Sequence, residues 1–291
     1  MRAARATGVP LVLEVNSPLV QEMAATRRIY FRGLAERVER SIFQGADRIA
    51  VVTQALGEIL VGLGAPRERL FVTPNGIDPH RYARRAYPAV WRSRWGIPEG
   101  AVVLGFVGFY RPWHRLDRVV RCLPELPNAF CVSVGDGPAR AETEALARDL
   151  GVEKRVLFPG RVTGEEIPGV VAAFDVALIP AINVYASPLK LFDYLAAGRA
   201  TIAPDQPNLR EVVQHGRTGW LFDPGSDASF HEGVLRLVRD LRLRQEIAEA
   251  GQRLIAEYPY TWDANVTRIL AQVAALRPSG APPREPAPLR G

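Results

Sequence analysis

The sequence predicts an α/β protein with two parallel-sheet domains, the first of them incomplete. Short apolar runs rich in β-branched residues alternate with longer amphipathic segments, which is typical of repeated strand–helix units. The 291 residues, of which 47% are hydrophobic, are enough for a substantial core and for two domains. A stretch rich in Pro, Arg and Trp interrupts the alternation after residue 74. Together these observations predict two Rossmann-like, doubly wound units joined by a linker.

The first series of elements is too short for a whole domain of this kind. Its periodicity predicts strands at residues 9–15, 48–53 and 69–73, and helices at 19–43 and 54–63. Turn-forming residues follow at 74–79, and an irregular stretch continues to residue 98. Because domains usually contain about 100 to 150 residues, we expect a partial N-terminal domain over residues 1–82 and an interdomain linker over 83–100.

The second series predicts a complete Rossmann-like domain over residues 101–258. Its strands are expected at residues 102–107, 130–134, 156–158, 176–179, 201–203 and 219–222, with helices in the intervals and at 230–240 and 242–258. A last helix at 262–276 follows, within a segment (259–276) placed to cross back to the first domain. Residues 277–291 have nothing to bury and are expected to form a disordered tail.

Composition excludes several classes of function. The net charge of +6 and the pI near 9.7 are a mild surplus, and the basic residues do not cluster with aromatic ones, so no nucleic-acid partner is expected. Cys122 and Cys131 form no metal-ligand or disulfide pattern and are expected to pack in the core. No stretch approaches the roughly 18 apolar residues of a membrane span, and no signal peptide is recognisable. These features predict a cytoplasmic protein.

The segment Ser187-Pro188-Leu189-Lys190 predicts a helix start at the carboxyl end of a strand. Ser187 suits the N-cap and Pro188 the first helical position of a helix over residues 189–197. The N–H groups of Leu189 and Lys190 would then be free to bind a phosphate. An ordinary capped helix is the alternative.

Lys190 favours the phosphate site, because a cation in the first turn opposes the helix dipole. Lysine is also rare here, since only Lys154 and Lys190 accompany 35 arginines. Asp193, one turn further on, is either a partner for sugar hydroxyls or a surface carboxylate.

The loop that follows the strand at 102–107 carries a second group of donors. Gly108 permits close backbone approach, and Arg111 and His114 lie where doubly wound folds bind their ligands, so a diphosphate would suit this loop. A basic surface turn is the alternative. Gly135 and Gly137 make a tight turn after the next strand, at the same edge of the sheet.

The order and spacing of these motifs resemble glycosyltransferase family 4, the retaining sugar-nucleotide transferases of the GT-B fold. The resemblance covers nearly the whole chain except the tail and rests on residues 13–18, 46–49, 72–78, 108–117, 134–138, 158–160, 173–180, 187–198 and 216–219. It implies two Rossmann-like domains that face each other across a cleft, with the donor in the C-terminal one. No D-x-D triplet occurs, and fixed donors can stabilise a leaving diphosphate, so neither a metal nor another cofactor is expected.

The resemblance also implies roles for individual residues. The expected catalytic residues are Asp193, which would contact the ribose, Arg111 and Lys190. The expected donor-binding residues are Gly108, His114, Gly135, Gly137, Arg161, Tyr185, Ser187, Pro188 and Leu189, with Arg161 next to the base. Asn16 is expected on the acceptor side, where many members of the family have a histidine.

Several positions depart from the family pattern. Tyr185 and Asp193 occupy the two ends of a paired-glutamate motif, and Phe109 and His114 stand where basic residues are usual. Family members also carry further strand–helix units before residue 9. The chain is therefore expected to lack the first part of the N-terminal domain, as a fragment, as a short variant completed by a partner, or as a degenerate transferase.

Three functions remain open at this stage. The leading hypothesis is sugar transfer from a nucleoside-diphosphate sugar to a saccharide or lipid-linked hydroxyl acceptor in polysaccharide or glycolipid assembly. The alternatives are nucleotide binding without catalysis and a sugar-nucleotide epimerase. Arginines and apolar residues alternate over residues 27–42, so this helix either has a solvated basic face or makes a peripheral contact with the inner face of the membrane.

Overall fold

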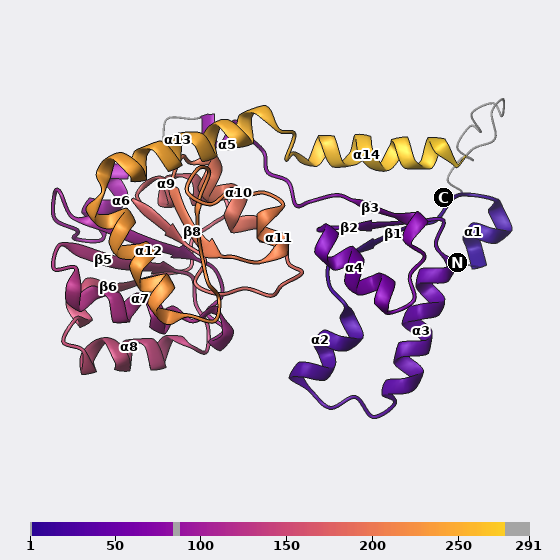
Figure 1. Cartoon of the computed structure of the whole chain (residues 1–291), viewed down its shortest axis with the longest axis horizontal. Coiled ribbons are helices and arrows are strands. Elements are labelled where there is room, and N and C mark those ends of the chain that lie inside the picture. Colours follow the sequence, from indigo (N-terminus) through magenta and orange to yellow (C-terminus); the bar gives the residue numbers. More distant parts are fainter. Residues whose placement is uncertain (1, 84–87, 277–291) are drawn as a thin grey trace, which may run out of the picture.

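The computed structural model describes residues 2–83 and 88–276 and contains two parallel sheets, each with helices packed on it (Figure 1). The predicted tail at 277–291 and residues 84–87 of the predicted linker lie outside the described residues. The α/β class predicted from the sequence is confirmed, because all pairings between named strands are parallel and helices connect most of them.

The N-terminal sheet has three strands in the order β1-β2-β3. They are β1 (Val12–Val15), β2 (Arg48–Val51) and β3 (Leu70–Val72), and the accompanying helices are α1 (Arg2–Thr7), α2 (Leu19–Thr26), α3 (Arg32–Gly45), α4 (Gln54–Gly62) and the 3₁₀ turn η1 (Arg67–Arg69). A small core forms around Phe43, Ile49 and Leu56. All three predicted strands are present, each shortened at one or both ends.

The single long helix predicted at 19–43 is wrong, because the structure has two helices there. The chain leaves α2 at Arg27, whose backbone is extended (φ −154°, ψ 160°), and α3 begins only after Phe31. Ile29, Tyr30 and Phe31 lie between the helices, and β-branched and aromatic residues lose side-chain freedom in a helix. Tyr30 and Phe31 are 80% and 77% exposed, so no packing offsets that loss.

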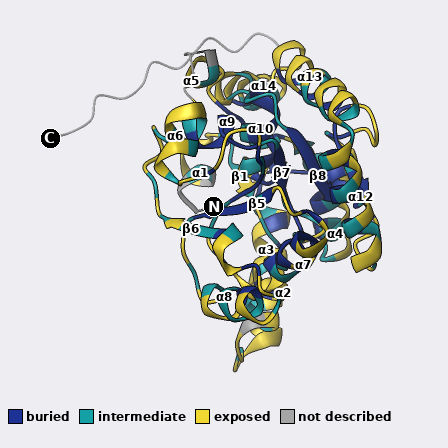
Figure 2. Ribbon diagram, turned by 90° about the vertical axis from the view of Figure 1, so that its left-hand side faces the viewer, coloured by how far each residue is buried: buried dark blue, intermediate teal, exposed yellow. Residues whose placement is uncertain are grey.

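The C-terminal sheet has the strand order β6-β5-β4-β7-β8-β9. Its strands are β4 (Val102–Val107), β5 (Ala129–Val134), β6 (Val156–Gly160), β7 (Val176–Leu178), β8 (Ala200–Pro204) and β9 (Trp220–Phe222), close to the predicted ranges. Its helices are α7 (Leu116–Cys122), α8 (Arg140–Asp149), α9 (Ile167–Ala172), α10 (Leu189–Ala196), α11 (Pro207–Arg210), α12 (Asp227–Arg239) and α13 (Leu241–Glu257), with the 3₁₀ turns η2 (Pro112–His114), η3 (Leu123–Glu125) and η4 (Glu153–Arg155). Figure 2 shows the sheet as the buried layer.

The two predicted core cysteines are confirmed in this domain. Cys122 and Cys131 are unpaired and buried. Burial raises the pKa of both thiols to about 12.

Two segments connect the domains. The first contains α5 (His80–Ala83) and α6 (Pro88–Arg94), and the second is α14 (Trp262–Ala275), which extends from the C-terminal domain along the N-terminal one (Figure 1). Arg48 Nε of β2 donates to Gln272 Oε1 (3.1 Å), and Asn265 Nδ2 donates to Pro74 O (2.6 Å). The last helix is therefore bonded to the first domain.

The strand order puts the switch point of the sheet between β4 and β7. In a doubly wound sheet, ligands bind at the carboxyl ends of the strands where the direction of the connections reverses. Here β4 connects onward to β5 on one side, whereas its other neighbour β7 connects onward to β8. The loop after β4 and the start of α10, which follows β7, meet at this point.

Candidate active site at the carboxyl end of the C-terminal sheet

Three glycines let the loop after β4 pack directly against the loop after β5. Gly108, Gly135 and Gly137 have φ angles of +151°, +133° and +153°, which residues with a Cβ rarely adopt. The loops are also joined by a backbone hydrogen bond from Tyr110 N to Asp136 O (2.8 Å). The glycines thus set the path of the backbone at the edge where a ligand would lie.

The helix α10 starts at this edge, but its cap differs from the prediction. The N-cap residue is Pro188, without a side-chain cap, and the first helical residue is Leu189. The prediction of Ser187 as N-cap is wrong because its hydroxyl is engaged elsewhere: Ser187 Oγ accepts a hydrogen bond from Asn75 N (3.1 Å). Within the described residues, the N–H groups of Leu189 and Lys190 have no acceptor, as an anion site requires.

Lys190 connects α10 to the loop after β4. Its Nζ lies 3.9 Å from the centre of the Phe106 ring, and an ideal Cβ on Gly108 would lie 2.8 Å from the same atom. Burial lowers the pKa of Lys190 to about 7. The amine is therefore expected to gain a proton when an anion binds next to it.

His114 and Arg111 complete the basic edge. His114 Nδ1 accepts a hydrogen bond from Arg111 N (3.3 Å), and burial together with the charge of Lys190 lowers the pKa of His114 to about 4. His114 is therefore a neutral imidazole at physiological pH. The Arg111 guanidinium lies exposed between the rings of Phe109 (4.7 Å) and Trp113 (5.2 Å).

Asp193 lies on α10 one turn beyond Lys190 and already has a partner. Tyr82 in α5 donates its hydroxyl hydrogen to Asp193 Oδ1. The next residue, Tyr194, accepts a hydrogen bond from Val107 N (2.9 Å) and so fixes α10 against the end of β4. Arg161 is exposed in the loop after β6, beside Val162.

Two further predicted residues, Tyr185 and Asn16, lie at or in the N-terminal domain. Tyr185 packs against the core of the N-terminal domain, and its carbonyl accepts a hydrogen bond from Thr53 Oγ1 (2.9 Å). Asn16 is exposed after β1, with Nδ2 3.4 Å from Glu14 Oε1. Asn16 is thus part of the N-terminal domain, whereas Tyr185 reaches that domain from the loop between β7 and α10.

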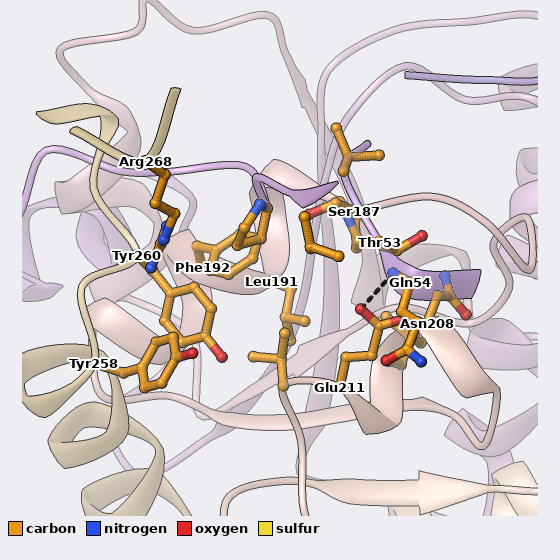
Figure 3. Close-up of a pocket in the computed structure, with 16 residues that line it drawn as sticks. Thr53, Gln54, Ser187, Leu191, Phe192, Asn208, Glu211, Tyr258, Tyr260 and Arg268 are labelled. Atoms are coloured by element: carbon orange, nitrogen blue, oxygen red, sulfur yellow. Dashed lines mark hydrogen bonds between the residues drawn. The ribbon is translucent and has the colours of Figure 1, made fainter. Parts of the chain in front are cut away.

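A pocket of about 340 Å³ lies between the domains, and the predicted donor-binding residues Ser187 and Pro188 are among the residues that line it (Figure 3). Leu191 and Phe192 of α10 line it, whereas Lys190 and Asp193 are not among its described lining residues. At its edge Glu211 accepts hydrogen bonds from the N–H groups of Gln54 (2.9 Å) and Ala55 (3.0 Å) at the start of α4.

Sequence reasoning missed Tyr82, Tyr194 and Glu211. Tyr82 and its partner Asp193 are 111 residues apart in the sequence, and Glu211 and its partner Gln54 are 157 residues apart. The only local signal was the position of Tyr194, which follows Asp193 in the helix predicted over residues 189–197.

Two features are absent from the part of the chain that the structure describes. No group of three or more His, Cys, Asp or Glu side chains within residues 2–83 and 88–276 is arranged to hold a metal ion. Among the described helices, none combines the length and the apolar character that crossing a membrane requires.

Comparison with protein families matches both halves of the chain. The family described as glycosyl transferases group 1 matches residues 89–254. The family described as a glycosyl transferase 4-like domain matches residues 1–76.

Individual proteins that are similar to this chain in sequence are also named as glycosyltransferases. A 2-deoxystreptamine glucosyltransferase from Streptomyces kanamyceticus is 32% identical over 250 residues, which cover 82% of this chain and 64% of that protein. A GDP-mannose-dependent alpha-mannosyltransferase from Mycobacterium tuberculosis is 28% identical over 284 residues, covering 95% of this chain and 69% of that protein. The chain thus spans less than two thirds of the length of the glucosyltransferase.

Among solved structures, that of Anabaena Alr3699/HepE in complex with UDP superposes with a TM-score of 0.82 at 21% sequence identity. The superposition covers 94% of this chain and 75% of the Anabaena protein. This likeness shows the fold, a GT-B arrangement of two Rossmann-like domains.

Proposed function

This chain belongs to the group 1 glycosyl transferases, and on that premise we propose that it forms the donor-binding part of an enzyme that transfers a sugar from a nucleoside-diphosphate sugar to a hydroxyl acceptor. The acceptor would be a saccharide or a lipid-linked sugar in polysaccharide or glycolipid assembly. Structures of the Anabaena relative contain UDP, and UDP-glucose in one case, which supports a donor of this class.

The observation that carries the proposal is the convergence of Lys190, the free N–H groups at the start of α10 and the Gly108 loop at the switch point of the sheet. A helix N-terminus and a cation both favour a diphosphate. The same donors stabilise the negative charge that develops on the diphosphate as the glycosidic bond breaks. We expect Arg111, which lies in the same loop as Gly108, to add charge once the ligand is bound.

Two further features of the reaction are proposed. Because Lys190, Arg111 and backbone N–H groups supply the electrophilic stabilisation, we expect transfer without a metal ion, and activity that survives a chelator would support this. Retention of the anomeric configuration follows from the resemblance to family 4. Proton NMR of the product at early times would distinguish retention from inversion.

The direct test of the function is release of nucleoside diphosphate. The protein is incubated with UDP- and GDP-sugars, with and without an acceptor extract. Sugar transfer predicts release that depends on the extract and is lost in Lys190→Met. Binding of UDP or GDP without any release would instead identify a nucleotide-binding protein without catalysis. A changed donor sugar in the absence of acceptor would identify an epimerase.

We also propose that the cytoplasmic protein contacts the inner face of the membrane through the α2–α3 hairpin, residues 19–45. The loop between the two helices projects away from the N-terminal sheet (Figure 1). Tyr30 and Phe31 at its tip are 80% and 77% exposed, and Arg27 and Arg28 are exposed beside them. Aromatic side chains flanked by cations suit an anionic lipid surface.

Vesicle flotation tests this contact. The protein is expected to float with phosphatidylglycerol vesicles at low salt and much less at high salt, because salt screens the arginines. Tyr30→Ser combined with Phe31→Ser should reduce the floating fraction severalfold, while Tyr258→Ser, a half-exposed tyrosine in the C-terminal domain, should not. Equal flotation of the double variant, or equal binding to neutral phosphatidylcholine vesicles, would count against the hairpin.

A further inference from the structure

The loop that leads into α10 is held by side chains from other parts of the chain. The loop, residues 179–188, is described in full and contains no helix or strand. Three side chains from outside it donate hydrogen bonds to four of its carbonyl groups. These bonds run from Thr53 to Tyr185 O, from Asn208 to Asn183 O and Ala186 O, and from Asn75 to Ser187 O. Tertiary contacts therefore decide where α10 starts.

Of these contacts, that of Asn75 lies nearest to α10 in the sequence. The backbone N–H of Asn75 donates to Ser187 Oγ (3.1 Å), and its side-chain Nδ2 donates to Ser187 O, so that one residue is held at two points. The next residue is Pro188, whose ring restricts its φ, here −75°. With Ser187 held and this angle restricted, the positions of the first N–H groups of α10 depend on Asn75.

Asn75 also lies where the two segments that connect the domains meet. The preceding residue, Pro74, accepts a hydrogen bond from Asn265 of α14 (2.6 Å). An ideal Cβ on the following residue, Gly76, would lie 2.7 Å from backbone atoms of residues 261 and 262, so the two backbones are in direct contact. Asn75 therefore joins the meeting point of these segments to the loop before α10.

We propose that Asn75 is a positioning residue for the diphosphate. It acts through Ser187, which it holds so that the N–H groups of Leu189 and Lys190 converge on the diphosphate. This inference rests on the proposed function, because it takes a nucleoside diphosphate as the ligand. Since linkage is reciprocal, a diphosphate that orders the start of α10 also stabilises the contact between Ser187 and the N-terminal domain.

Two measurements on Asn75→Ala test this role. Calorimetry with UDP, GDP and inorganic pyrophosphate should show about tenfold weaker binding of each probe, the effect expected for loss of one hydrogen bond. Hydrogen exchange is then measured at saturating probe. In the unmodified protein the probe should slow amide exchange both at the start of α10 and at residues 72–78. In Asn75→Ala the slowing at α10 should remain, and the slowing at residues 72–78 should be lost. A residue needed only for folding would not change this pattern.

Asn128→Ala is the matched control. The exposed Asn128 also donates from its side-chain amide to a carbonyl, Gly100 O (3.0 Å), but it precedes β5 and so lies at the opposite end of the sheet. Its variant should keep both the affinity and the slowing at residues 72–78. Ser187→Ala removes the other bond of the same contact and should weaken binding severalfold, so it tests the contact even where Asn75→Ala does not fold.

Melting temperatures show which variants are folded. Unchanged affinity of the folded variants at positions 75 and 187 would overturn the inference. So would weaker binding with the slowing at residues 72–78 retained, because the loss of affinity would then not pass through Asn75 and Ser187. Failure of the unmodified protein to bind any probe would instead overturn the proposed function.

Discussion

Lys190→Met is expected to lower the affinity for nucleoside diphosphates about 100-fold, the upper part of the range for a hydrogen bond to a charged group. Methionine keeps the apolar stem that packs over Phe106 but removes the only ammonium that the structure places against Gly108 within the described residues. The backbone N–H groups of α10 would remain, so binding should weaken rather than vanish. Lys154, the other lysine, is exposed, and Lys154→Met is the matched control with no expected effect.

The pH dependence of the affinity for nucleoside diphosphates gives a second measurement of the contact between Lys190 and the diphosphate. Burial lowers the pKa of Lys190 to about 7, so the amine of the unliganded protein is charged below that pH and neutral above it. A bound diphosphate favours the charged form and raises this pKa again. Affinity should therefore fall as the pH rises from 7 to 9, with proton uptake on binding. The burial-lowered pKa of His114, about 4, keeps this side chain neutral throughout that range.

Lys190→Met should lose this pH dependence. The ionisation of the ligand itself is the same for both proteins, so the difference between their affinities at each pH isolates the lysine. Calorimetry in two buffers of different ionisation enthalpy would measure the proton uptake directly. Equal affinities of the two proteins across this pH range would show that Lys190 does not contact the diphosphate.

The C-terminal sheet and the meeting of the Gly108 loop with α10 could be predicted because their signals are local. The strands β4 and β5 are apolar runs followed directly by glycines, and Lys190 is a rare lysine at a position that opposes the helix dipole. The strand order then brings Gly108 and α10 together, since parallel strands end at one edge of the sheet. For these residues, the local sequence pattern and the strand order are sufficient to predict that they lie close together.

Contacts between segments that are far apart in the sequence have no such local signal. Ser187 has the right residue type for an N-cap, yet its hydroxyl accepts from Asn75, 112 residues earlier. Tyr82 reaches Asp193 across the linker, and Glu211 binds the start of α4 in the other domain. In each case a local preference competes with a tertiary partner that the periodicity of the chain does not encode. The break after Arg27 also depends on tertiary context, because Tyr30 and Phe31 lack the packing that would offset their poor helix propensity.

Gly135→Ala is expected to cost about 3 kcal/mol of unfolding free energy, at the upper end for a strained backbone position. The added Cβ would lie 2.0 Å from Gly108 O and 2.9 Å from Gly108 C, both backbone atoms that cannot rotate away. The φ of +133° adds strain of its own. Relief requires the loop after β4 to move, which would break the bond from Gly108 N to Val134 O (2.9 Å). Affinity for nucleoside diphosphate should fall together with stability.

Gly151→Ala is the control that separates the cost of a positive φ from the cost of the steric clash between an added Cβ at position 135 and Gly108. Gly151 also has a positive φ, +66°, but an added Cβ would meet nothing within 4 Å, so only the strain of about 1 kcal/mol is expected. Urea unfolding gives the free energies, and calorimetry below the transition gives the affinities. Loop displacement predicts that Gly135→Ala loses both quantities, whereas Gly151→Ala loses a little stability and no affinity. If the two variants were equally stable and both bound nucleoside diphosphate normally, close packing of the two loops would not be what holds Gly108 beside Lys190.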